Sequence, residues 1–331
     1  MAAADRLRQE GLEVTIYDRY DRAGGLLTYG IPGFKLEKDV VMRRNEQLEK
    51  SGIKFVLNTN VGVDITFDEI REKHDFVILA TGVYKARELD IPNGDLNGKV
   101  AALDYLTASN RLSFGDRVEE FENGTFNANG KKVIVIGGGD TAMDCVRTAV
   151  RQGATSVKCL YRRDRANMPG SQREVKNAEE EGVIFEWLTS PKALSNELRD
   201  PDLLNLEAQE GDLKGIIVQK MRLGDPDATG RRTPEEIIGS EYLEEADLVI
   251  EALGFEPEDL PTLWDQPDLP VSRWGTIKVE YETGKTNLEK VYAVGDIVRG
   301  ASLVVWAIKD GRETANAILS EIEATKVIAA E

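Results

Sequence analysis

The pattern of apolar and polar residues along the chain alternates short strand-like runs with longer helix-like stretches. Its clearest segment begins with an apolar run at residues 133–136, which ends in three glycines at 137–139. A helical pattern follows from Asp140, and a second strand pattern covers residues 156–161. Strand, glycine turn, helix and strand in this order are typical of the βαβ unit that binds dinucleotides.

The glycine turn suits a phosphate site. Gly137 permits a tight turn, and the second glycine of the motif, Gly139, lets the backbone approach a pyrophosphate. Ala142 takes the third position and is small enough for helix and strand to pack closely. The free N–H groups and positive dipole end of the helix near Asp140 would then hold the pyrophosphate. Glycine turns also occur without nucleotides, so the prediction rests on the whole strand–turn–helix–strand context.

Two arginines, Arg162 and Arg163, follow the second strand, where such units commonly carry a carboxylate. A carboxylate there binds the adenosine ribose and repels a 2′-phosphate, whereas two guanidinium groups attract that phosphate. Arg165 and Arg173 lie further along and could assist. The alternative interpretation is a solvated basic loop; the position at the strand tip favours NADPH.

The start of the chain has the pattern of the second half of another such unit. Residues 1–11 predict a helix that ends at a glycine, and residues 12–17 a strand that leads to Asp18. Asp18 thus takes the ribose-binding position at the strand tip. A first strand and a glycine turn would precede this helix, so the chain looks cut just past that turn.

Further elements follow from the same periodicities. Helices are predicted at residues 38–51, 101–112, 168–181 and 302–319, strands at 53–57, 75–80, 183–187 and 248–254, and an antiparallel ribbon over 194–223. Val40, Val41 and Leu48 should lie on the inner face of the helix at 38–51. The small-residue turn after residues 75–80 is repeated at Ala252 to Gly254. Two similar nucleotide-binding units are therefore expected, in tandem or with one inserted in the other.

Composition narrows the class of protein. With 331 residues, of which 41% are apolar and 31% charged, the chain has room for two domains with their own cores. A net charge of −17, spread along the sequence, argues against nucleic acid as a partner. No apolar run approaches the roughly 18–20 residues that cross a bilayer, and no signal peptide is apparent. We therefore expect a cytoplasmic protein without a membrane span.

Few side chains are candidates for catalysis. Cys145 and Cys159 lie in the helix and second strand of one βαβ unit and form neither a C-x-x-C pair nor a metal cluster. We interpret them as buried, inert thiols and predict no metal site. His74, the only histidine, has no accompanying nucleophile or carboxylate pair, which favours a surface histidine at a helix end over a catalytic one.

Four strings of residues carry a resemblance to a known family: GGLLTYGIPGFKLEK at 24–38, GGGDTAMDCVR at 137–147, MPGS at 168–171 and GDIVRG at 295–300. From residue 1 to about residue 320 the chain resembles the small (β) subunit of bacterial NADPH-dependent glutamate synthase. Relatives of that subunit include the flavin half of dihydropyrimidine dehydrogenase and, more distantly, adrenodoxin-reductase-type enzymes. The resemblance implies an α/β fold of two Rossmann-like, three-layer nucleotide-binding domains. An NADPH-binding domain (99–261) would be inserted into an FAD-binding domain (1–98 and 262–331).

The resemblance also assigns cofactor contacts to matching positions. For FAD it implies Asp18 at the adenosine ribose, Leu26 and Lys35 at the flavin or its phosphates, Val61 at the adenine, Gly295 and Asp296 at the ribityl–pyrophosphate region, and Leu303 and Val304 near the isoalloxazine. For NADPH it implies Gly138, Gly139, Asp140 and Thr141 at the pyrophosphate, Arg162 and Arg163 at the 2′-phosphate, Glu174 at a ribose, and Ala252 to Gly254 beside the nicotinamide.

In such enzymes hydride passes directly from NADPH to FAD, so the core reaction needs no catalytic acid, base or nucleophile. The family passes the electrons through iron–sulfur clusters of an N-terminal domain to the large (α) subunit, where glutamate forms. Neither that domain nor the first FAD glycine turn is present in this sequence. We therefore expect a fragment that performs at most the first step, holds FAD weakly or not at all, and forms a homodimer through exposed strand edges. A free-standing NADPH:acceptor reductase and a nucleotide-binding fragment without flavin stay open as alternatives.

Overall fold

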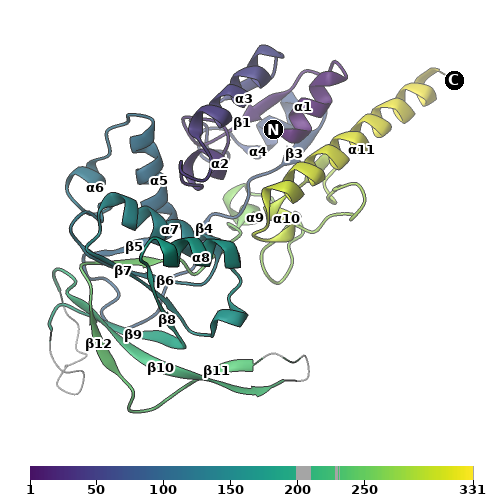
Figure 1. Cartoon of the computed structure of the whole chain (residues 1–331). Helices are drawn as coiled ribbons and strands as arrows, with labels where there is room; N and C mark the ends of the chain where they lie inside the picture. Colours follow the sequence, from purple (N-terminus) through teal and green to yellow (C-terminus); the bar gives the residue numbers. More distant parts are fainter. Residues whose placement is uncertain (199–209, 228–229, 231, 331) are drawn as a thin grey trace. The chain divides into compact units, whose positions relative to one another are not determined.

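The computed structural model describes residues 1–198, 210–227, 230 and 232–330. The chain forms two compact units (Figure 1). The first unit consists of Met1–Thr28, Glu37–Lys85 and Phe255–Glu331. The inserted unit consists of Tyr29–Leu36, which we call the strap, and Ala86–Gly254. One unit is thus inserted in the other.

The boundaries of these units differ from the predicted ones at 98/99 and 261/262. Leu89 and Leu96 pack into a core of the inserted unit, and the Leu89 N–H donates to Glu251 Oε1 at 3.1 Å. Leu260 packs instead with Phe67 in the first unit. These contacts join residues far apart in sequence, so no local pattern marks the boundaries.

A five-stranded parallel sheet of order β5-β13-β6-β7-β8 forms the centre of the inserted unit. Its strands are Lys99–Ala101 (β5), Leu248–Glu251 (β13), Lys132–Ile136 (β6), Ser156–Tyr161 (β7) and Ile184–Trp187 (β8). Val133 lies opposite Leu248 on one side and Val157 on the other. Parallel neighbours need crossover connections, and the helices of this unit are Ala102–Ser113 (α5), Glu119–Glu122 (α6), Asp140–Gln152 (α7) and Gln172–Glu180 (α8).

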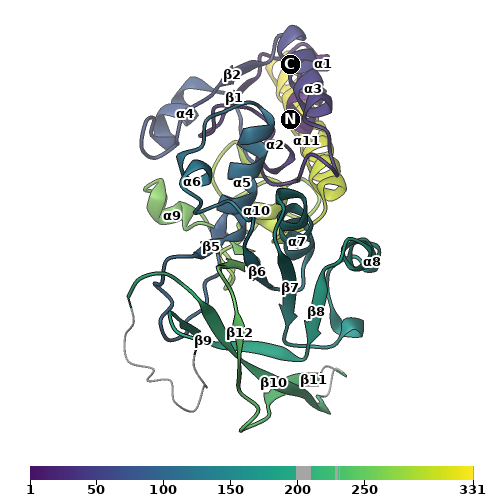
Figure 2. The ribbon, with the colours of Figure 1, turned by 60° about the vertical axis from the view of Figure 1, so that its left-hand side comes forward.

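Successive residues of β6 face opposite sides of this sheet, as expected for a strand. Val133 and Val135 pack in the core beneath the helices, with Tyr105 of α5. Ile134 and Ile136 pack on the other side, against a second, antiparallel sheet. That sheet comprises Thr189–Ser195 (β9), Gly215–Pro226 (β10), Arg232–Glu236 (β11) and Tyr242–Glu245 (β12). The inserted unit therefore has three layers: helices, a parallel sheet and an antiparallel sheet (Figure 2).

The first unit contains two pairs of parallel strands. Thr15–Tyr17 (β1) pairs with Lys54–Val56 (β2), and Val77–Leu79 (β3) pairs with Val291–Ala293 (β15). Where the chain enters and leaves the inserted unit, Lys85–Ala86 (β4) and Phe255–Glu256 (β14) form a further short pair. The helices are Ala2–Gln9 (α1), Leu26–Tyr29 (α2, which runs into the strap), Lys38–Lys50 (α3), Phe67–Lys73 (α4), Leu260–Leu263 (α9), Asp296–Arg299 (α10) and Val304–Ala330 (α11).

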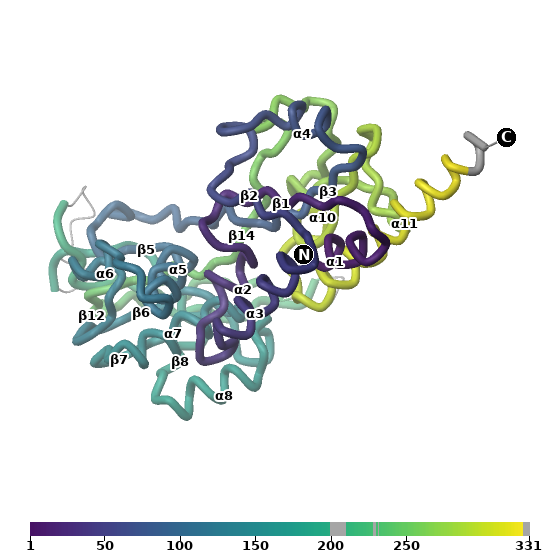
Figure 3. The backbone as a smooth tube through the Cα atoms, turned by 90° about the horizontal axis from the view of Figure 1, so that it is seen from above, coloured from purple at the N-terminus to yellow at the C-terminus, as the bar shows by residue number. Residues whose placement is uncertain are grey.

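Helix α1 lies beside α11 (Figure 3). Ala3 and Leu7 of α1 pack with Ala315 and Ile318 of α11. Opposite Ala3, α11 carries Gly311, where an added Cβ would lie 3.2 Å from the Ala3 nitrogen. The absence of a side chain at Gly311 thus permits the two helices to pack closely.

Two details of the predicted elements were wrong. The helix predicted at 168–181 begins only at Gln172, after a 3₁₀ turn at Arg165–Asn167, because Pro169 disfavours a helical conformation in the residue before it. Val40 of α3 is 40% exposed, whereas Val41 and Leu48 are buried, since residues seven apart share a helix face and Val40 lies about 100° away from it. The antiparallel ribbon predicted over 194–223 is formed by β9 and β10; its residues 199–209 lie outside the described residues.

None of the helices in the described residues is both long enough and apolar enough to span a bilayer. Within the same part of the chain, no group of three or more His, Cys, Asp or Glu side chains could hold a metal ion.

Candidate dinucleotide-binding site

The glycine turn follows β6, and two of its three glycines are required by contacts within the protein. Gly137 has a φ of 151°, and an added Cβ would lie 2.2 Å from the Ala252 carbonyl oxygen. At Gly138 an added Cβ would lie 2.3 Å from the Tyr161 ring. At Gly139, the N-cap of α7, it would meet nothing within 4 Å. Space therefore stays open at the start of α7, where the unpaired N–H groups of a helix favour an anion.

The loop at residues 168–171 bonds to this glycine turn. The Gly170 N–H donates to the Gly138 carbonyl at 2.8 Å, and the Ser171 N–H donates to Asp140 Oδ1 at 2.9 Å. Asp140 therefore uses its carboxylate to hold the loop, which leaves backbone N–H groups as the donors for a phosphate. The sequence pattern predicts the start of a helix at residues 168–171 and does not reveal their hydrogen bonds to the glycine turn.

The arginines after β7 differ in their surroundings. Arg162 is exposed, whereas Arg163 is half-buried, and its Nε is buried without a hydrogen-bond partner in the part of the chain that the structure describes. Arg165 is held elsewhere, because its two terminal nitrogens donate to Glu179 at 2.7 and 2.8 Å. Arg163 is thus the arginine with a buried donor available for an anion.

The carboxyl ends of neighbouring parallel strands bring the predicted NADPH residues to one edge of the sheet. The Ala252 N–H, just after β13, donates to the Ile136 carbonyl at the end of β6, at 2.9 Å. Gly254 follows with a φ of 93° and open space around its Cα. Ligands of open α/β sheets bind at this edge. Gly137, which starts the glycine turn, lies against Ala252 there.

Lys35 and Glu174, assigned to different cofactors, meet in one ion-pair cluster of the inserted unit. Lys35 Nζ lies 2.7 Å from Asp144 and 3.4 Å from Glu174, and Arg147 contacts Glu174 and Glu181, both at 2.7 Å. Burial raises the pKa of Asp144 to about 6, although Lys35 opposes the shift. The Arg151 and Arg147 guanidinium groups hold the pKa of Glu181 at about 2. The sequence pattern gives no sign of this cluster, and the cofactor roles of Lys35 and Glu174 stay predictions.

In the first unit, Asp18 follows β1 and is half-buried. Its Oδ1 accepts a hydrogen bond from the Tyr20 N–H at 3.0 Å. Burial raises the pKa of Asp18, while the Tyr20 backbone and Arg19 oppose the shift. Val61, predicted at the adenine, is half-buried and forms an isolated bridge with Ile65.

The turn after β15 contains the next pair of predicted FAD residues. Gly295 has a φ of 73°, which favours glycine, and is the N-cap of α10. Burial raises the pKa of Asp296, against a hydrogen bond from the Ser302 backbone. Leu303 and Val304, at the start of α11, are 59% and 44% exposed. Adjacent exposed apolar side chains often indicate a binding surface.

The cysteines are buried, as predicted. Cys159 Sγ donates to the Gly137 carbonyl at 3.4 Å, and burial raises the pKa of its thiol to about 12. Burial also raises the pKa of the Cys145 thiol. His74 does end a helix, α4, but it is half-buried, and its Nε2 lies 3.1 Å from the Tyr17 hydroxyl.

Known proteins are similar to this chain in sequence over most of its length. The family model of the pyridine nucleotide-disulphide oxidoreductases matches residues 1–311. A protein of Cereibacter sphaeroides assigned as a glutamate synthase (NADPH) small chain is 66% identical over 332 residues, which span all of this chain and 76% of the relative. The chain belongs to the pyridine nucleotide-disulphide oxidoreductases, in the glutamate synthase small-chain group.

A second relative and a solved structure of the same fold agree with the assignment. The glutamate synthase (NADPH) small chain of Azospirillum brasilense is 57% identical over 335 residues, which cover all of this chain and 67% of the relative. The structure of FprA from Mycobacterium tuberculosis in complex with NADPH superposes with a TM-score of 0.76, over 99% of this chain and 83% of FprA, at 20% identity. The family resemblance and the two-domain α/β fold predicted from the sequence are thus confirmed, and the chain is an oxidoreductase.

Proposed function

We propose that this oxidoreductase binds NADPH at the glycine turn of the inserted unit and FAD on the first unit, as the electron-input part of a glutamate synthase. The observation that carries the NADPH assignment is Arg163, whose buried Nε has no hydrogen-bond partner among the described residues. Bound NADPH supplies a hydride, which bound FAD accepts.

The residues around the glycine turn fit a dinucleotide with a 2′-phosphate. The first turn of α7 offers backbone N–H groups beside the open space at Gly139. Arg163, two residues past the end of β7, offers a planar, permanently charged donor for the phosphate, with Arg162 exposed beside it. Gly138, Asp140 and Thr141 would complete the pyrophosphate site.

The first unit offers groups that fit FAD. The Asp18 carboxylate, at the end of β1, suits the hydroxyls of an adenosine ribose. Gly295 and Asp296 start a helix after β15, and the exposed apolar Leu303 and Val304 suit a flat aromatic ring. Leu26 and Val61 are proposed to line the flavin and the adenine.

The chain's own contribution to hydride transfer is positioning rather than acid–base chemistry. Cys145 and Cys159 are buried thiols with raised pKa values, so they are poor nucleophiles. Arg163 and the backbone of the glycine turn would fix the nicotinamide nucleotide, and the small residues Ala252 and Gly254 would leave room beside its ring.

The names of the two close relatives support a place in glutamate synthase, with a large subunit as the partner. This chain supplies only two cysteines, whereas an iron–sulfur cluster usually takes about four thiolates. Electrons that leave its flavin for a large subunit would therefore pass through clusters held by other parts of the assembly.

Hydride transfer is tested by mixing the chain, supplied with FAD, with NADPH or NADH under anaerobic conditions. We expect the visible absorption of the flavin to bleach with NADPH and much more slowly with NADH. Ferricyanide should then support steady oxidation of NADPH. If both nucleotides are shown to bind but the flavin absorption does not change, the proposed transfer is wrong.

The place in glutamate synthase needs a separate measurement. The same mixture, with a glutamate synthase large subunit, glutamine and 2-oxoglutarate, should yield glutamate only after the protein segment that holds the clusters is added. Glutamate formed without that segment, at a rate that depends on this chain, would contradict the proposed electron path.

A further inference from the structure

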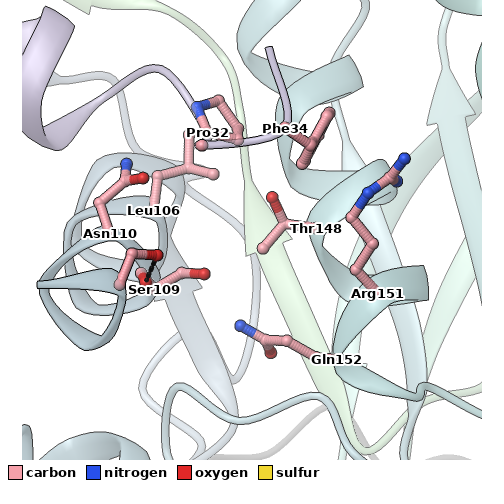
Figure 4. Close-up of a pocket in the computed structure, with 10 residues that line it drawn as sticks. Pro32, Phe34, Leu106, Ser109, Asn110, Thr148, Arg151 and Gln152 are labelled. Atoms are coloured by element: carbon pink, nitrogen blue, oxygen red, sulfur yellow. Dashed lines mark hydrogen bonds between the residues drawn. The ribbon is translucent and has the colours of Figure 1, made fainter. Parts of the chain in front are cut away.

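The inserted unit contains a cavity of about 370 Å³ between α5, α7 and the strap (Figure 4). Its walls include Pro32 and Phe34 of the strap and Leu106 of α5, which are apolar, and Thr148 and Gln152 of α7, which are polar. None of these residues is among those proposed to bind NADPH or FAD. The volume is within the range of small-molecule sites.

Two polar groups of α7 face this cavity without hydrogen-bond partners in the described residues. Thr148 is 4% exposed, and its Oγ1 is buried and unpaired. The Gln152 Nε2 is likewise buried and unpaired. Figure 4 shows both side chains directed toward the space between α5 and α7. Buried polar groups without partners are uncommon in proteins and need an explanation.

The orientation of the Gln152 amide is fixed by the hydrogen bonds that its oxygen accepts. Gln152 Oε1 accepts from the Ala128 N–H at 2.9 Å and from the Tyr105 hydroxyl at 3.0 Å. A backbone N–H can only donate, so the oxygen must face Ala128 and the NH₂ group must face the cavity. The cavity therefore presents two amide N–H donors and one hydroxyl, which call for an oxygen acceptor.

The charges around the cavity favour a neutral ligand. Arg151, the charged residue of the lining, pairs with Glu181 at 2.6 Å and stacks on the Phe34 ring, 3.9 Å from its centroid. Gln152 is the last residue of α7 and Ser113 the last of α5, so both helices present the negative ends of their dipoles here. Helix carboxyl ends disfavour anions.

We propose that this cavity binds a small uncharged carboxamide, whose carbonyl oxygen accepts hydrogen bonds from Gln152 Nε2 and Thr148 Oγ1. The apolar body of the ligand would lie against Leu106, Pro32 and Phe34, and its own N–H groups would face the helix carboxyl ends. The site is independent of the proposed hydride transfer, since it uses none of the groups assigned to either nucleotide.

Two isosteric substitutions test the assigned contacts. Thr148→Val keeps the shape and removes the hydroxyl. Gln152→Glu keeps an oxygen for Ala128 and Tyr105 and places an acceptor where the NH₂ group was. Each should weaken binding about fivefold, the effect of losing one hydrogen bond. Thr107→Val, on α5 but outside the cavity, is the matched control and should not change the affinity.

The probes are cyclohexanecarboxamide and cyclohexanecarboxylate, which have the same shape and a saturated ring unlike nicotinamide. Calorimetric titration of the full chain should show binding of the carboxamide and at least fivefold weaker binding of the carboxylate. The side-chain NH₂ signals of Gln152 in NMR spectra, identified by their loss in Gln152→Glu, should shift with the carboxamide.

Three results would overturn the proposal. Absence of carboxamide binding, with unchanged Gln152 signals, would show that the cavity holds only water. Equal affinity for the carboxylate would reject a neutral ligand. Unchanged affinity in folded Thr148→Val and Gln152→Glu proteins would place the binding elsewhere.

Discussion

Replacing Arg163 with methionine should weaken NADPH binding while leaving the fold as stable as before, or more so. Methionine keeps an unbranched stem of similar length, so the packing of the half-buried side chain is largely preserved. A hydrogen bond between charged groups contributes about 1.5–3 kcal/mol, which predicts an NADPH affinity about 10- to 150-fold lower. NADH has no 2′-phosphate, so its affinity should fall less than about threefold.

The stability of the same variant gives an independent readout. In the described residues, Arg163 Nε is buried without a partner, and an unsatisfied buried donor costs about 1–3 kcal/mol. Removing that donor should therefore leave the thermal midpoint of the nucleotide-free protein unchanged or raise it. Loss of affinity and retained stability together would separate a binding role from a structural one.

Fluorescence titration with NADPH and NADH, and thermal unfolding without nucleotide, measure both effects. Arg165→Met is the matched control, because it removes a nearby arginine whose guanidinium already pairs with Glu179. That variant should bind NADPH about as tightly as the original protein. Equal losses of NADPH and NADH affinity in Arg163→Met, or equal NADPH losses in both variants, would refute the assignment of Arg163 to the 2′-phosphate.

Three further predictions follow from the inserted unit. Gly138→Ala should lower the thermal midpoint, at a cost of about 1–3 kcal/mol, because its Cβ would lie 2.3 Å from a tyrosine ring; Gly139→Ala, with open space, should keep the midpoint and weaken NADPH binding. Burial raises the pKa of Asp144 from an ordinary 3.8 to about 6, so the folded protein keeps a proton that the unfolded chain releases. The stability that this proton gives the folded state is lost as pH rises through about 6. Asp144→Asn should therefore gain thermal stability relative to the original protein as pH rises from about 4 to about 7, and a constant difference would contradict this. Cys145 and Cys159 should react with a thiol reagent only after unfolding, since both are fully buried; rapid labelling of the native protein would show otherwise.

The βαβ unit at residues 132–161 could be predicted because its signals are local. An apolar strand, three glycines and a helical period each fix the chain over a few residues, and the structure has β6, α7 and β7 there. Asp18 at the end of a strand is predictable for the same reason.

Contacts between distant segments could not be read from the sequence. The loop before the helix at 172–180 is held by Gly170, whose N–H bonds to Gly138 more than thirty residues earlier. Lys35 sits in a glycine- and proline-rich loop whose local pattern does not reveal its pairing with Asp144. In the sequence, Thr148 and Gln152 are ordinary positions of an amphipathic helix. Their unpaired polar atoms become evident only from the packing of α5 and the strap against α7.

Because of the strap, the inserted unit is formed by two separate segments of the chain, which affects the design of any fragment of this protein. Residues 29–36 supply Lys35 to Asp144 and place Phe34 under Arg147 and Arg151, yet they are separated from residue 86 by a long stretch of the first unit. In a polypeptide of residues 86–254 alone, Asp144, Arg147 and Arg151 would lack their contacts with the strap. Any fragment meant to contain the whole inserted unit therefore has to include the strap as well as residues 86–254.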